Sequence, residues 1–148
     1  MKKFKFRLQS VLDARIKKLE DCQLEMAKVQ DRLNKEVQHL ECLYETLKNT
    51  KNELELILKA GSSINLLEIR SYQGYIVKVK GQITNQHKII ADTENELEGK
   101  KQAVLEALKA KTMLEKLKEK NLKEFIANVE RLDFVEIDEI ATNRHKRI

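Results

Sequence analysis

One seven-residue repeat of apolar side chains runs through the first part of the chain without an exception. Its members, which we call the a positions, are Leu12, Leu19, Met26, Leu33, Leu40, Leu47 and Leu54. An α-helix returns to nearly the same face every seven residues, so a strict repeat of this length specifies a long helix in a left-handed supercoil. The chain must therefore supply a partner for one long apolar stripe.

The d positions between these residues are less uniform. Four of the seven are apolar in the series Arg15, Cys22, Val29, Glu36, Leu43, Thr50 and Ile57. Apolar side chains at the following e positions, namely Ile16, Val37, Tyr44 and Leu58, are expected to widen the stripe.

A second repeat follows, with Ile69, Ile76, Ile83, Ile90, Leu97 and Val104 seven residues apart. Its alternate positions are Tyr72, Val79, Gln86, Thr93, Lys100 and Ala107. Continued further, the repeat would place Lys111 and Lys118 on the apolar face, whereas apolar residues resume at Leu114, Leu117 and Leu122. This pattern predicts a phase slip between Lys111 and Lys118.

The two repeats are separated by a single turn signal, Ala60-Gly61-Ser62-Ser63. Gly61 suits the left-handed residue that ends a helix, and Ser62 or Ser63 suits the N-cap of the next helix. We predict a single domain over residues 1–148, with helix one over about 4–59, a turn over 60–64, helix two over about 65–140 and a flexible tail over 141–148.

Two long helices joined by a short turn run antiparallel, so the predicted fold is an all-α coiled-coil hairpin in which partner residue numbers sum to about 124. Ala, Glu, Lys, Leu and Arg make up 76 of the 148 residues, and proline is absent, which excludes most sheet folds. Since the two stripes satisfy each other, we expect a monomer. The longer second helix overhangs, and its stripe of Leu122, Phe125, Val129 and Leu132 is either an interface for a partner or a place where the chain folds back or dimerises.

Charge is strongly segregated along the chain. The net charge is +6 over residues 1–18, −4 over 19–99, +5 over 100–123, −5 over 124–140 and +3 over 141–148. In the hairpin the two basic segments meet at the end opposite the turn. Their mutual repulsion would be relieved by an acidic protein surface, although a solvated face is the simpler reading. Nucleic acid is a weaker candidate, because lysine dominates and aromatic residues are not interleaved with the charge.

The sequence offers no chemistry for catalysis. It has no glycine-rich phosphate loop and no nucleophile with an arranged base, so we expect neither an enzyme nor a bound cofactor. His39, Cys42 and His87 would lie nearly level in the hairpin, but their spacing matches no usual zinc motif, and no metal site is expected. No apolar run is long enough for a signal core or a membrane span, which predicts a cytoplasmic protein.

Four short stretches resemble a known family. They are Phe4-Lys-Phe6-Arg-Leu8-Gln-Ser-Val11-Leu12, then Tyr72-Gln73-Gly74-Tyr75-Ile76, then Leu114-Glu-Lys-Leu117-Lys-Glu-Lys120 with Phe125, and Asp138-Glu139-Ile140-Ala141. Their order and the length of the hairpin resemble the FliJ family of the bacterial flagellar protein-export apparatus, to which the YscO proteins of injectisomes are related.

The resemblance implies a non-enzymatic, stalk-like coupling factor, cytoplasmic and peripheral to the inner membrane. Its implied partners are the hexameric export ATPase, the membrane export-gate protein and, for some members, export chaperones; a generic coiled-coil adaptor or chaperone is the alternative. In the family the end carrying both termini enters the ATPase ring. We therefore assign ring contacts to Phe4, Phe6, Leu8, Leu117, Lys120, Leu122, Phe125 and Val129, and electrostatic steering to Lys2, Lys3, Lys5, Arg7, Lys116, Lys118 and Lys123.

Overall fold

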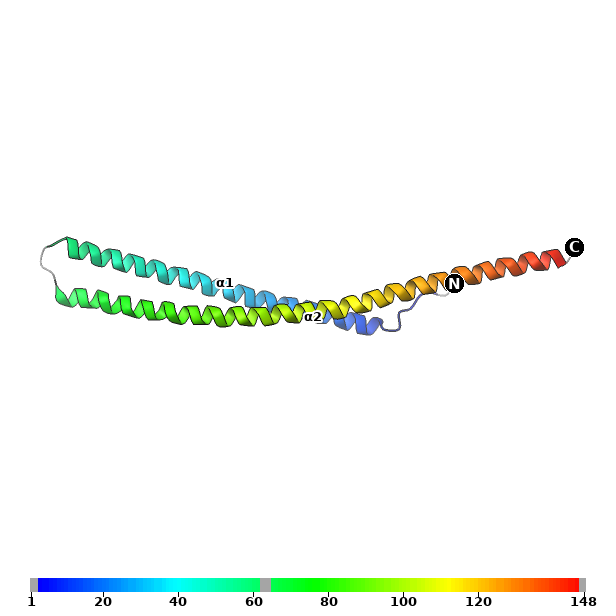
Figure 1. The fold of residues 1–148 in the computed structure, drawn as a ribbon, viewed down its shortest axis with the longest axis horizontal. Helices are drawn as coiled ribbons and strands as arrows, with labels where there is room; N and C mark the ends of the chain where they lie inside the picture. Colours follow the sequence, from blue (N-terminus) through cyan, green and yellow to red (C-terminus); the bar gives the residue numbers. More distant parts are fainter. Residues whose placement is uncertain (1–2, 62–64, 147–148) are drawn as a thin grey trace. The chain divides into compact units, whose positions relative to one another are not determined.

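The computed structural model describes residues 3–61 and 65–146, nearly all of them in two helices. Helix α1 spans Gln9–Lys59 and helix α2 spans Leu66–Lys146. The two helices pack against each other as an antiparallel hairpin, and the described residues contain no strand (Figure 1). The predicted all-α hairpin is therefore confirmed.

The turn is built partly as predicted. Gly61 has a φ of 63°, the left-handed conformation that ends α1. The side chain of Asn65 caps α2, since its Oδ1 accepts a hydrogen bond from the Leu67 N–H at 3.0 Å. Asn65 thus takes the capping role that the sequence suggested for Ser62 or Ser63, both of which lie outside the described residues.

Both outer helix ends differ from the prediction. Helix α1 begins at Gln9 instead of about residue 4, because residues 3–8 are non-helical and the Gln9 N–H bonds to the carbonyl of Phe6 at 3.1 Å. Helix α2 continues to Lys146, through most of the tail predicted to be flexible. Basic side chains in its last turn, Arg144 and Lys146 among them, interact favourably with the helix dipole there.

The chain divides into two compact units, which we describe separately. The hairpin unit comprises Gln23–Ala103, and the terminal unit comprises Met1–Cys22 together with Val104–Ile148.

In the hairpin unit the two repeats form one seam, the line of a and d positions along which the helices meet. Its centre is a buried cluster of Leu43, Val79 and Ile83, with Leu40 and Leu47 packed against it. The predicted a positions of this unit are all buried or half-buried. The e positions Val37, Tyr44 and Leu58 are 36%, 48% and 49% exposed, so the prediction that they widen the stripe was wrong for this unit. A two-helix contact covers only the narrow a/d line.

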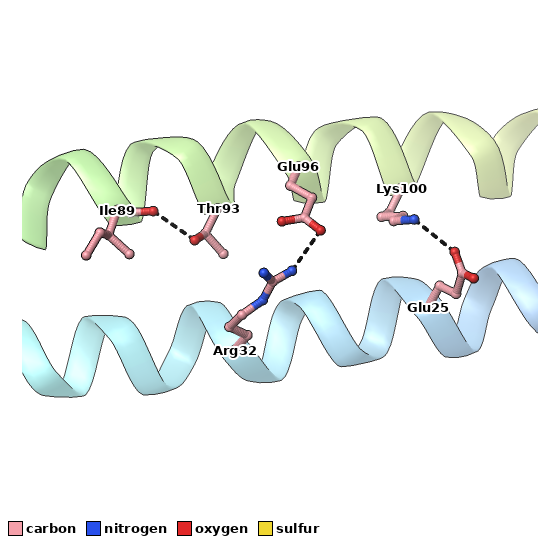
Figure 2. A network of polar contacts seen from close by, with 6 residues as sticks. All are labelled: Glu25, Arg32, Ile89, Thr93, Glu96 and Lys100. Atoms are coloured by element: carbon pink, nitrogen blue, oxygen red, sulfur yellow. Dashed lines mark hydrogen bonds and ion pairs between the residues drawn. The ribbon is translucent and has the colours of Figure 1, made fainter.

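Two ion pairs join the helices across the edge of the seam in the hairpin unit (Figure 2). Arg32 pairs with Glu96 at 2.8 Å, and Lys100 pairs with Glu25 at 2.9 Å. The hydrogen bond from Lys100 and its positive charge lower the pKa of the Glu25 carboxyl below its ordinary value. Residue numbers of Glu25 and Lys100 sum to 125, in agreement with the predicted sum of about 124.

Val79 and Val77 provide a matched test of the seam. Val79 is 1% exposed and Val77 is 70% exposed, two residues apart on α2. We expect Val79→Ala to lower the free energy of unfolding by about 2 kcal/mol, because it leaves a cavity in the central cluster. Val77→Ala should change it by less than about 0.5 kcal/mol. Urea denaturation followed by circular dichroism measures both, and equal effects would show that the seam lies on another face.

Candidate interaction surface in the terminal unit

The chain begins with a non-helical arm, residues 3–8, that packs on α2. Phe6 is buried in this unit, and Phe4 contacts Phe125 with ring centroids 5.6 Å apart and planes inclined at 51°. The arm therefore covers α2 as far as Phe125. The overhang predicted from the two helix lengths leaves Phe125 without a partner in helix one. In the structure Phe125 contacts Phe4, because the arm extends past the start of α1.

The seam of the terminal unit continues without the predicted phase slip. Its buried and half-buried residues on α2 include Val104, Ala107, Lys111, Leu114, Lys118, Asn121 and Phe125, which keep the alternating spacing of three and four; Ala110 and Thr112 beside Lys111 are half-buried as well. The predicted slip was wrong because lysine can lay its aliphatic stem along apolar surface while its ammonium group reaches a polar partner. Lys118 donates to Oε1 of Gln9 at 2.7 Å, and Lys111 lies 3.4 Å from Glu115.

The residues assigned to ring contact fall into two groups. Phe4, Phe6, Leu8 and Phe125 are buried or half-buried, with Phe6 in the intramolecular core. Leu117, Lys120, Leu122 and Val129 are exposed. Residues of the first group pack the arm against α2. Residues of the second group are the ones accessible to a partner protein.

The residues assigned to steering are mostly free to act at the surface. Lys3, Lys5, Arg7, Lys116 and Lys123 are exposed, whereas Lys118 is half-buried against Gln9 and Lys2 lies outside the described residues. Lys123 is also paired with Glu119 at 3.3 Å, but both side chains remain largely exposed. Most of the positive charge of segments 1–18 and 100–123 therefore lies in the terminal unit, as expected from the predicted hairpin.

An open hollow lies where the arm meets α2. It is lined by Lys3, Phe4, Lys5, Asn121, Glu124, Phe125 and Asn128. Its lining mixes cationic, anionic, amide and aromatic groups, which suits contact with a protein side chain, and it carries no arrangement of groups for catalysis.

Past the hollow, the apolar surface of α2 is larger than the sequence stripe indicated. The exposed large apolar residues are Ile126, Val129, Leu132, Phe134, Val135, Ile137 and Ile140. The predicted stripe contains only Val129 and Leu132 among them. Continuing the alternating spacing of three and four from Leu132 reaches Val135 but none of the others.

Other candidate sites have structural explanations. The hydroxyl of Tyr44 lies 2.9 Å from Nε2 of His87. Cys22 and Cys42 are free thiols. Across residues 3–61 and 65–146, no group of three metal-ligating side chains is close enough to hold an ion. The same residues include no helical stretch with the length and apolar character of a membrane span.

Comparison with known proteins decides the family. The family model described as flagellar FliJ protein matches residues 4–147, nearly the whole chain. The chain belongs to the FliJ family. It is therefore a component of the flagellar protein-export apparatus, in a family of non-catalytic export components that interact with other parts of that apparatus. Comparisons with curated proteins and with solved structures gave no significant match.

Phe6 tests how the arm of this FliJ-family chain is anchored. We expect Phe6→Ala to release the arm, because a buried aromatic ring is lost, and to accelerate trypsin cleavage after Lys5 and Arg7 by about tenfold or more. Hydrogen exchange at the Gln9 amide, which bonds to the Phe6 carbonyl, should accelerate in parallel. Phe134→Ala is the control, since Phe134 is 75% exposed. Equal cleavage rates in the two variants would contradict an anchored arm.

Proposed function

We propose that the chain is a stalk-like coupling factor of flagellar export, without enzymatic activity of its own, that binds the hexameric export ATPase through its terminal unit. The observation that carries this proposal is that residues 1–18, of net charge +6, and residues 104–123, with six lysines against three glutamates, belong to one unit that also bears exposed apolar residues. A ring interface needs both features, because charge accelerates encounter and apolar contact slows release.

The proposal includes two further partners, which the resemblance to the family implies. The chain binds the membrane export-gate protein, escorts export chaperones, and works in the cytoplasm at the periphery of the inner membrane. FliJ membership supports an export role in general, and the absence of a spanning helix in the described residues is compatible with peripheral attachment. We assign no residues to the gate or to chaperones.

Binding to the ring proceeds in two stages in this proposal. Exposed lysines of the arm and of α2 first draw the terminal unit toward an acidic surface, an effect that salt screens over roughly 10 Å. Leu117, Leu122 and Val129, which are 37%, 37% and 38% exposed, then lose their contact with water against the ring. The buried Phe6 holds the arm in place during both stages.

Charge reversal tests the first stage. We choose Lys3, Lys5, Lys116 and Lys120, which are exposed, and change all four to Glu. Association with the purified ring should slow by about tenfold or more at low salt and by much less at high salt, because exposed charges act mainly on the association rate. Surface plasmon resonance at two salt concentrations measures this.

The matched control carries the same change in net charge. Lys51, Lys78, Lys80 and Lys88 are exposed in the hairpin unit, and their reversal to Glu should leave association nearly unchanged. If the two fourfold variants slow association equally, the effect comes from net charge, and the lysines of the terminal unit have no specific role in binding the ring.

Truncation of apolar residues tests the second stage. Leu122→Ala with Val129→Ala should raise the dissociation rate by about tenfold, because two buried anchors are lost, and should leave the association rate unchanged. Leu66→Ala with Val77→Ala removes the same atoms from residues 73% and 70% exposed in the hairpin unit. No effect of either pair on the ring complex would favour a generic adaptor that presents its apolar face to other proteins.

A further inference from the structure

We propose that half-buried Glu36 and buried Gln86 form a register lock, a polar layer in the seam that selects one alignment of α1 against α2 in the hairpin unit. Gln86 is 3% exposed, and its Nε2 donates to the backbone carbonyl of Glu36 at 2.9 Å and to Oε2 of the same residue. Both amide protons are thus used by one residue of the opposite helix. This inference concerns the hairpin unit alone and does not depend on which partner the protein binds.

The apolar a layers cannot select the alignment by themselves. In the observed alignment Leu33 lies level with Ile90, Leu40 with Ile83 and Leu47 with Ile76. A shift of one heptad, about 10 Å along the helices, would set Leu40 level with Ile90 or Ile76. Leu40 and Leu47 would again face isoleucines, and Leu33 would face Ile83 or Leu97, so these apolar layers scarcely distinguish the alternatives.

Two other buried polar residues of the seam are also indifferent to the alignment. The hydroxyl of Thr50 donates to the carbonyl of Thr46 at 2.7 Å, and that of Thr93 donates to the carbonyl of Ile89 at 2.8 Å (Figure 2). Both bonds lie within one helix and follow that helix when it shifts. These hydroxyls would be satisfied in any register.

The Glu36–Gln86 layer behaves differently, because its hydrogen bonds cross between the helices. A shift of one heptad would place Glu36 level with Val79 or Thr93, and Gln86 level with Val29 or Leu43. A buried amide facing only apolar side chains keeps the full cost of its lost hydration. A single polar layer in an otherwise apolar coiled coil is known to specify alignment in this way.

The ion pairs at the edge of the seam are weaker determinants. The side chains of Arg32 and Glu96 are 50% and 44% exposed, and those of Lys100 and Glu25 are 35% and 60% exposed. Exposed pairs on flexible side chains contribute little and can exchange partners. These ion pairs assist the observed alignment, whereas the buried amide of Gln86 disfavours the shifted alignments.

Thiol cross-linking in the full chain reads the alignment directly. In a background with Cys22→Ser and Cys42→Ser, Leu33→Cys is combined in turn with Ile90→Cys, which reports the observed alignment, and with Ile83→Cys or Leu97→Cys, which report shifts of one heptad. A short thiol cross-linker bridges only level positions. With the lock intact, we expect the Leu33–Ile90 product and only background product from the shifted pairs.

The lock is removed by Glu36→Leu with Gln86→Leu. Product from the shifted pairs should rise about tenfold, while the helical signal persists and the melting temperature rises, because two polar side chains are replaced by apolar ones. Gln86→Leu alone should lower the melting temperature, since it leaves the Glu36 carboxylate facing a leucine. Swapping the pair, by Glu36→Gln with Gln86→Glu, keeps a donor opposite an acceptor and should retain only the observed alignment.

Thr50→Val with Thr93→Val is the matched control, because it also removes two polar side chains from the seam. It should give no shifted product. Shifted product from this control equal to that from the double-leucine variant would overturn the proposal, as would a double-leucine variant that forms only the Leu33–Ile90 product. Loss of helical signal in the double-leucine variant would likewise overturn it, because the pair would then maintain the fold and not the alignment.

Discussion

The structure depends on one narrow line of contact between two helices. A pair of helices has no third element to cover its other faces, so nearly all its stability must come from the a and d positions of both helices. Val79 is almost fully buried, while residues two positions away are open to water. This restriction explains why most of the large apolar residues outside the seam remain exposed and available to partners.

Much of the hairpin could be predicted because the a/d line is periodic. The seven a positions from Leu12 to Leu54, the second repeat from Ile69 and the left-handed Gly61 are local signals, and the structure places each of them as expected. The cap at Asn65 escaped prediction because Asn and Ser are equally good caps and the choice depends on where the turn closes.

The errors concentrate in the terminal unit, where long-range packing overrides local pattern. Lys111 and Lys118 looked too polar for the seam, yet their aliphatic stems lie along it and their ammonium groups find partners. The arm was expected to continue α1, whereas the burial of Phe6 and the contact of Phe4 with Phe125 hold it in a non-helical course. Neither contact produces a periodic pattern in the sequence. The part of the candidate surface formed by the arm could therefore not be predicted from the spacing of apolar residues.

The nesting of contacts around the turn also implies an order of folding. Contact between Leu43 and Val79 closes a short loop, whereas contact between Phe4 and Phe125 encloses nearly the whole chain. Loop-closure entropy favours the short closure first, after which each heptad brings the next one together. We therefore expect the hairpin unit to form first and the terminal unit to form last. For the same reason the ends of the terminal unit should be the first to fray. The contact between the Phe4 and Phe125 rings should then form late and open early, while the seam of the hairpin unit stays closed.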